Sequence, residues 1–144
     1  MARASIGGII PALALLFLTA CSGLWLDCYW RSEKYVLLAV DAKSQMSLSL
    51  DMGGGSALGL VGPTVFAIGS DAKYIVVKQH PARNSFATEF DRSVTDYYIV
   101  ERSQSPDFQA RQKLVSGHFS EAQYADLTKK LSLPPFTKTF ADLE

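Results

Sequence analysis

The sequence predicts an α+β fold, a mainly antiparallel β-sheet of about five to six strands with one C-terminal amphipathic helix packed on it. Short apolar runs rich in β-branched residues recur between residues 34 and 102, and a single helical pattern follows from Ser120. Strands therefore do not alternate with helices, as they would in a doubly wound fold. The chain has 144 residues, of which 48% are hydrophobic, and this suffices for one domain with its own core.

Five runs have strand character: Lys34–Asp41, Gln45–Asp51, Pro63–Ile68, Lys73–Gln79 and Tyr97–Arg102. The third and fourth runs flank Gly69–Ala72, whose residues favour a tight turn, so they predict a hairpin. The polar segments Pro81–Val94 and Ser103–Lys113 are expected to be loops. Half of the ten glycines fall between Gly53 and Gly62, and we expect a mobile connection there.

The helix is predicted from its start signal, its apolar stripe and its stop signal. Ser120 and Gln123 form a capping-box pattern, in which each side chain bonds the backbone of the other. Apolar residues then recur on one helical face: Tyr124, Leu127 and Leu131. Pro134 ends the pattern, because proline does not continue a helix.

The first residues have the pattern of a targeting segment. Arg3 precedes an apolar stretch from Ile6 to Leu18, which is shorter than the roughly 20 apolar residues of a membrane-spanning helix and fits a secretory signal. Leu18-Thr19-Ala20-Cys21 resembles the lipobox of bacterial lipoproteins. The resemblance implies cleavage between Ala20 and Cys21 and acylation of the Cys21 thiol. The alternative is an ordinary secretory signal with an unmodified Cys21.

This resemblance divides the chain into three parts. Residues 1–20 are expected to be a removed lipoprotein signal peptide, 21–33 an acylated cysteine with a short membrane-proximal segment, and 34–144 the single folded domain. Ser22 implies the outer membrane, facing the periplasm, since lipoproteins of this type retained in the inner membrane tend to have aspartate there. The aromatic stretch 24–30 has two interpretations, rings at the lipid headgroups or a first strand.

Three segments of the folded part follow a recurring order: Val65–Lys78, Tyr97–Val100 and Gly117–Ser120. The order is similar to that in families of small bacterial lipoproteins described only as domains of unknown function. In those families a strand, a G-x-D/N turn and a strand ending in lysine precede a Tyr-Ile strand and a helix start. His118 stands where proline is expected. The resemblance supports the fold and implies no catalytic residue.

Composition excludes several classes of function. The formal net charge is zero, with 14 basic and 14 acidic side chains, so the chain lacks the basic excess of a nucleic-acid binder. Two cysteines are too few for a disulfide scaffold or a four-thiolate zinc site. If Cys21 carries lipid, Cys28 is expected to be a buried thiol, or alternatively to form an intermolecular disulfide.

Candidates for chemistry are weak, and we expect no catalytic residue, metal or cofactor. Ser70 and Lys73 match the S-x-x-K pattern of penicillin-recognising enzymes, but they stand in the predicted hairpin turn. Neither His80 nor His118 has further ligands at metal-site spacing. Three acidic residues of the 81–96 region are candidates for acid–base chemistry by paired carboxylates: Glu89, Asp91 and Asp96. The alternative is that they are simply solvated in a polar loop.

The segment Pro81–Val94 is the candidate for partner contact. It contains two aromatic residues beside two arginines, residue types favoured at interface hot spots: Phe86, Phe90, Arg83 and Arg92. The alternative is that these side chains pack against the sheet.

Taken together, the sequence predicts a non-catalytic envelope lipoprotein, anchored to the membrane by lipid, that binds another periplasmic or outer-membrane component, with an envelope protein as the expected partner. Two alternatives stay open. One is an immunity or inhibitor lipoprotein against a periplasm-targeted toxin or enzyme. The other is a cell-wall or lipid hydrolase whose site is not recognised, for which Ser70, Lys73, His80 and His118 are the candidates.

Overall fold

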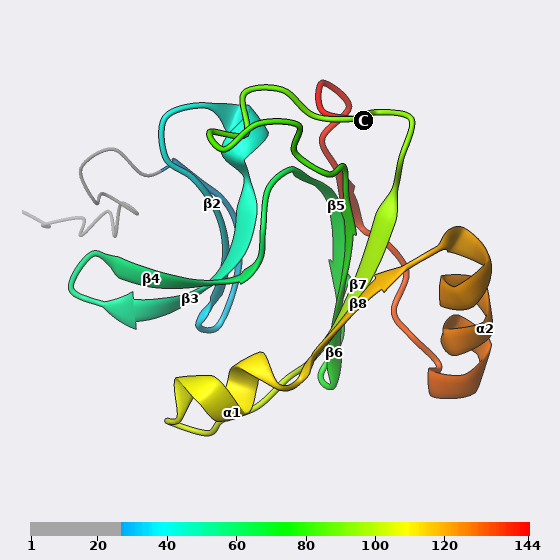
Figure 1. Ribbon diagram of the computed structural model, residues 1–144. Coiled ribbons are helices and arrows are strands. Elements are labelled where there is room, and N and C mark those ends of the chain that lie inside the picture. The colour runs from blue at the N-terminus through cyan, green and yellow to red at the C-terminus, as the bar shows by residue number, and fades with distance from the viewer. Residues whose placement is uncertain (1–26) are drawn as a thin grey trace, which may run out of the picture.

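The computed structural model describes residues 27–144, which form two antiparallel sheets and an outer helix (Figure 1). The first sheet has the strand order β1-β2-β3-β4 and the second the order β8-β7-β6-β5-β9. In chain order the elements are β1 (Asp27–Ser32), β2 (Tyr35–Ala39), the 3-10 turn η1 (Lys43–Gln45), β3 (Ser47–Gly53), β4 (Ser56–Val61), β5 (Val65–Ser70), β6 (Tyr74–Gln79), β7 (Asp96–Glu101), α1 (Phe108–Gln112), β8 (Val115–Phe119), α2 (Glu121–Leu131) and β9 (Lys138–Thr139). None of the helices in this range has the length and apolar character needed to cross a membrane.

The main core lies between the two sheets. Successive strand side chains point to opposite faces, so alternate residues of β2 and β3 face inward, with Leu37 directly opposite Leu48. Ile75 and Val77 face them from β6, and all four side chains are completely buried. Phe140, near the C-terminus, closes the same cluster.

A second cluster covers the other face of the second sheet, where α2 packs. The rings of Tyr97 on β7 and Tyr124 on α2 stack with centroids 4.7 Å apart, and Val76 of β6 lies buried beside them. Both faces of this sheet are therefore covered, and the molecule has three layers: first sheet, second sheet and α2 (Figure 1).

The predicted helix is confirmed. The Ser120 side chain accepts a hydrogen bond from the Gln123 amide at 3.3 Å, and the Gln123 side chain accepts from the Ser120 amide at 2.9 Å. The helix ends at Leu131, and Ser132 takes a left-handed conformation with φ of 54°.

The chain beyond α2 runs back across the edge of the second sheet. Thr137 donates a backbone hydrogen bond to Ile68 at 3.0 Å, and β9 then pairs with β5. The approach is so close that a Cβ atom on Gly69 would lie 1.9 Å from the carbonyl oxygen of Pro135. Only glycine fits at this position of β5.

The predicted antiparallel, β-rich character is confirmed, but the prediction of one sheet with about five to six strands is wrong, because nine strands form two sheets among residues 27–144. The predicted hairpin around Gly69–Ala72 is confirmed as β5 and β6. The glycine-rich region forms a hairpin instead of the expected mobile connection: Gly54 and Gly55 make the turn between Gly53 at the end of β3 and Ser56 at the start of β4, and all three glycines have positive φ. β4 was not predicted, because it is an exposed edge strand without a continuous apolar run.

Two further elements lie where polar loops or no regular structure were expected. α1 falls inside the predicted loop Ser103–Lys113 and is capped by Asp107, whose carboxylate accepts from the Gln109 amide at 2.9 Å. β8 pairs with β7 as an edge strand. Both are five residues long, too short for a periodic pattern to identify them.

The signal segment, Ala20 and Cys21 lie outside the described residues. Within the stretch 24–30, the described part belongs to β1, which pairs with β2, as the strand interpretation predicts. Cys28 on this strand is half-buried, and its Sγ lies 3.7 Å from the carbonyl oxygen of Trp30.

Candidate functional site

The 81–94 loop, residues 81–94 between β6 and β7, is closed by contacts across its base. Ala82 and Phe90 form an isolated antiparallel bridge. Arg83 and Asp91 form an ion pair at 2.9 Å, and the Asp91 amide donates to the Pro81 carbonyl at 2.9 Å. These contacts therefore give the loop a defined conformation.

Asp91 is the best-bound carboxylate of the loop. Its Oδ1 accepts from the Ser93 hydroxyl at 2.6 Å and from the Ser93 amide at 3.0 Å. The Ser93 hydroxyl, followed by the Arg83 guanidinium, lowers the pKa of Asp91 from 3.8 to about 2. The ionised carboxylate therefore holds the loop closed. A group with so low a pKa is not suited to donate a proton.

Arg92 and Phe90 connect the loop to the rest of the molecule. The Arg92 guanidinium lies 4.8 Å from the centre of the Phe90 ring. It donates to the backbone carbonyl of Asp142 at 2.8 Å and to that of Glu144. These two side chains tie the loop to the C-terminal residues.

Phe86 occupies a different position from the other three residues expected to contact a partner. Its side chain is 75% exposed, the most of any large apolar residue in the described range. Its backbone carbonyl accepts a hydrogen bond from Gln45 of η1 at 2.9 Å. Arg83 is also well exposed, although paired with Asp91. Contact of these residues with a partner stays a prediction.

His80 lies in the core. It is 3% exposed, and its ring stacks on Phe66 with centroids 4.1 Å apart and interplanar angle 13°. Nδ1 lies 2.6 Å from the Val94 carbonyl oxygen, and Nε2 is buried without a hydrogen-bond partner. The imidazole therefore has no route to a substrate.

His118 and the acidic residues do not form a common site. His118 is exposed, and its Nδ1 lies 3.3 Å from the Asp96 carboxylate. Asp91 pairs instead with Arg83. Among residues 27–144, no three His, Cys, Asp or Glu side chains converge in a way that could hold a metal ion.

Ser70 and Lys73 belong to the β5–β6 turn. Asp71 between them accepts backbone hydrogen bonds from Lys73 and Tyr74, each at 2.7 Å. The Tyr74 amide is the main cause of the lowered pKa of Asp71. Lys73 directs its ammonium group over the Tyr74 ring, 4.9 Å from the centroid, so the S-x-x-K pattern is part of a hairpin turn.

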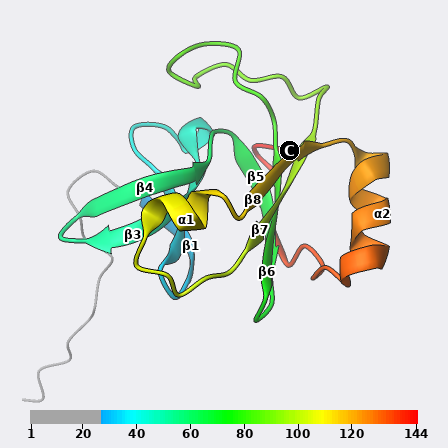
Figure 2. The same ribbon diagram turned by 60° about the horizontal axis from the view of Figure 1, so that its bottom comes forward.

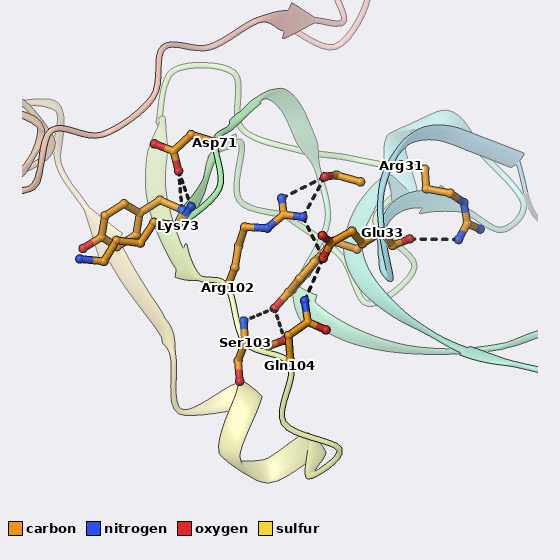
Figure 3. Close-up of polar contacts among 10 residues, drawn as sticks. Arg31, Glu33, Asp71, Lys73, Arg102, Ser103 and Gln104 are labelled. Atoms are coloured by element: carbon orange, nitrogen blue, oxygen red, sulfur yellow. Dashed lines mark hydrogen bonds and ion pairs between the residues drawn. The ribbon is translucent and has the colours of Figure 1, made fainter.

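A polar cluster joins the ends of the two sheets, and Figure 3 shows it. Both terminal nitrogens of Arg102 lie 2.9 Å from the Ser32 hydroxyl oxygen, and one lies 3.3 Å from the Glu33 carboxylate. Gln104 donates to Glu33 at 3.1 Å, and the Gln104 and Arg102 side chains lower the pKa of Glu33. The Ser103 amide donates to the Tyr35 hydroxyl at 3.0 Å.

A cavity of about 270 Å³ lies between α2 and β8 on the outer face of the second sheet. Tyr74, Ile99, Leu127 and Leu131 give it apolar walls, and Glu101 and Lys113 are also among its lining residues. Its volume is just below the range of roughly 300–1,000 Å³ that is usual for small-molecule sites.

Sequence reasoning missed both the cavity and the polar cluster. Each depends on residues brought together by strand pairing, such as Ser32 and Arg102. The stripe that contains Leu127 and Leu131 was visible in the sequence, but the strand β8 facing it was not. The sequence therefore indicated only the side of the cavity that α2 forms.

Residues 32–140 match the model of a family described as "Protein of unknown function (DUF3997)". The expected similarity to a small domain of unknown function is thus confirmed. The match begins after Cys21 and does not bear on the lipobox. No curated protein and no solved structure matches the chain.

Proposed function

We propose that the chain, which belongs to the DUF3997 family, is a lipid-anchored protein of the bacterial envelope that binds another envelope component and is not an enzyme. One observation carries the proposal. Only residues 22–26 separate the lipobox-like Leu18-Thr19-Ala20-Cys21 from β1, which begins at Asp27. An acylated Cys21 would therefore be followed almost at once by a folded domain.

The geometry of the candidate residues supports binding over catalysis. Ser70 and Lys73 frame a hairpin turn, His80 is enclosed in the core, and His118 contacts a single carboxylate at the surface. A nucleophile needs a base within hydrogen-bonding reach, and none of these residues is placed as such a pair. The hydrolase alternative thus has little support from its own candidates.

The anchor also agrees with a stable location at the membrane. Two or more acyl chains hold a protein at a bilayer, whereas one chain alone gives marginal binding. Ser22 after the cysteine favours the periplasmic face of the outer membrane as the destination.

The anchor is tested by growing cells with an alkyne-bearing palmitate and comparing wild type with Cys21→Ser. We expect labelled wild-type protein in the outer-membrane fraction. The variant is expected to stay unlabelled and to keep its signal segment, since cleavage follows acylation. A wild-type protein that is cleaved but unlabelled would show an ordinary secretory signal.

Partner binding is tested by crosslinking in intact cells followed by affinity purification. We expect wild type to capture a specific envelope protein that the Cys21→Ser variant captures poorly. Two further variants locate the contact: Phe86→Ser alters the tip of the 81–94 loop, and Ser116→Trp fills the cavity beside α2. Capture of an enzyme that the purified domain inhibits would identify the inhibitor form of the proposal.

A hydrolytic activity of the purified domain would contradict the proposal if it is lost in one of the variants Ser70→Ala, Lys73→Ala or His118→Ala. These residues lie outside the core, so the variants are expected to fold.

A further inference from the structure

We propose that the end of the domain formed by the 81–94 loop, η1 and Val40 rests on the lipid bilayer that holds the anchor, with the Phe86 ring at the headgroup boundary. This inference rests on the proposed acylation of Cys21. It specifies a fixed orientation of the domain on the membrane, which the anchor alone does not require.

The first step is where the chain enters the fold. β1 begins at Asp27, which pairs with Ala39 at the end of β2. The exposed Val40 follows directly, and η1 begins at Lys43. The ammonium group of Lys43 lies 5.7 Å from the centre of the Tyr29 ring on β1. The segment leading from Cys21 therefore joins the domain at the end that carries Val40 and η1.

The second step connects this end to the 81–94 loop. Gln45 of η1 donates to the Phe86 carbonyl at 2.9 Å. Lys43 pairs with Asp142 at 2.7 Å, and Arg92 of the loop donates to the Asp142 carbonyl. Figures 1 and 2 both show the 81–94 loop and η1 at the opposite end of the molecule from the β5–β6 turn.

The third step is the length of the tether. From Cys21 to Asp27 a fully extended chain spans about 20 Å. A domain of this size is roughly 35 Å across, from its expected radius of gyration. The tether is thus too short for the domain to stand on its far end, with the β5–β6 turn on the bilayer, and it keeps the Val40 end near the lipid.

The fourth step is the surface itself. Phe86 is 75% exposed, Val40 55% and Val94 41%, so three of the five exposed large apolar side chains in the described range belong to this end. An apolar phenylalanine ring is more stable at the boundary between headgroups and acyl chains than in water. The closed base of the loop and the Gln45 contact hold Phe86 outward.

The charges at this end indicate an apolar contact and not an electrostatic one. Lys43 is paired with Asp142 and Arg83 with Asp91, and Arg92 is occupied by the C-terminal carbonyls. Among the described residues, this end therefore offers no excess of unpaired basic side chains to select anionic lipids. The contact should form on a zwitterionic bilayer and persist at high salt.

The test uses the full chain, produced with its own signal and acylated at Cys21, in vesicles of phosphatidylcholine. In a Cys28→Ser background, an environment-sensitive dye is attached to Ser85→Cys, next to the Phe86 ring. The matched control places the dye on Ala72→Cys in the β5–β6 turn; both Ser85 and Ala72 are exposed. Nitroxide-bearing lipids then quench whichever dye lies at the bilayer.

We expect quenching at position 85 several-fold stronger than at position 72, unchanged by salt, and reduced several-fold by adding Phe86→Ser. Equal quenching at the two positions, or stronger quenching at 72, would overturn the inference. So would a dye at 85 that stays in water while Phe86→Ser abolishes capture of a protein in cells, because the ring would then belong to a protein interface.

Flotation of the vesicles separates this outcome from failure of the proposed function. If the protein floats and the dye at 85 is not quenched, the orientation is wrong and the anchor stands. If the wild-type protein carries no lipid and does not float, the anchor is wrong, and the inference is overturned together with it.

Discussion

At the scale of single residues, His80 is held by contacts that exclude it from solvent. A carbonyl oxygen can only accept, so the 2.6 Å contact with Val94 requires the proton on Nδ1. The other ring nitrogen, Nε2, is buried without a hydrogen-bond partner. The ring packs on Phe66 as an aromatic core residue.

His80→Ala is expected to lower the free energy of unfolding by about 2–4 kcal/mol, since it opens a cavity and leaves the Val94 carbonyl unsatisfied. His118→Ala is the matched control, with an expected change within about 0.5 kcal/mol because that ring is exposed. Urea denaturation of the purified domain measures both. A loss in His80→Ala as small as that expected for His118→Ala would show that His80 is not a core residue.

The lowered pKa of Asp91 predicts that the 81–94 loop becomes less stable in acid. Its pKa falls from 3.8 to about 2 on folding, so the folded state favours the carboxylate. The stabilisation is complete above 3.8 and disappears as the pH falls through about 2. A carboxyl titration by NMR should give this low midpoint, with amide protection of the 81–94 loop lost over the same interval.

Asp91→Asn is the control for this titration, because it removes the titrating group and the ion pair with Arg83. The acid-dependent loss of loop protection should then disappear. An Asp91 midpoint near 3.8 in the wild type would mean that the Ser93 and Arg83 contacts do not persist in solution.

At the scale of elements, what could be predicted depends on how local the determinants are. α2 was predictable because Ser120, Gln123 and Pro134 lie within or beside it. The hairpin β5–β6 was predictable from its two apolar runs and the turn Gly69–Ala72. β4 was not, since its strand character comes from pairing with β3, and the glycines within and beside it suggested flexibility.

The candidate sites follow the same division. The prediction singled out Phe86 from its residue type and neighbours, and the structure shows it exposed. It could not distinguish Phe86 from Phe90, because the inward position of Phe90 depends on the bridge to Ala82 and the stack toward His80. The Arg102 cluster requires two sheets, which the sequence did not indicate.

Gly69 and Gly59 provide a matched pair of strand glycines. Gly69→Ala places a Cβ 1.9 Å from the Pro135 carbonyl, so β5 and the chain after α2 must separate. We expect a loss of about 1–3 kcal/mol or more in the free energy of unfolding. Gly59→Ala on β4 meets no atom within 4 Å and should be neutral or stabilising by up to about 1 kcal/mol.

Chemical denaturation of the two glycine variants under the same conditions measures this difference. If Gly69→Ala is as stable as wild type, the chain after α2 does not pack against β5 in solution. A destabilised Gly59→Ala would instead indicate that β4 is covered by a contact that the described residues do not provide.

At the scale of the whole molecule, the two sheets have separate hydrogen-bond ladders but share one core, so we expect them to unfold as one unit. The inter-sheet core supplies most of this coupling, since its residues come from both sheets. The polar cluster at the β1–β2 turn adds a directional link. Arg102 at its centre is only 9% exposed, whereas the Glu33 side chain is 59% exposed, so the bonds to Ser32 matter more than the ion pair.

Arg102→Met is therefore expected to lower the free energy of unfolding by roughly 1.5–3 kcal/mol, through loss of the charged donors to Ser32 and of the stack on Tyr35. Arg102→Lys should recover only part, because an ammonium group cannot reproduce the planar fork. Glu33→Gln should have little effect. Urea unfolding followed by circular dichroism and tryptophan fluorescence should give coincident transitions in all three, as one cooperative domain requires. Transitions that separate in Arg102→Met would show that the sheets unfold independently once this link is removed, and that the core alone does not couple them.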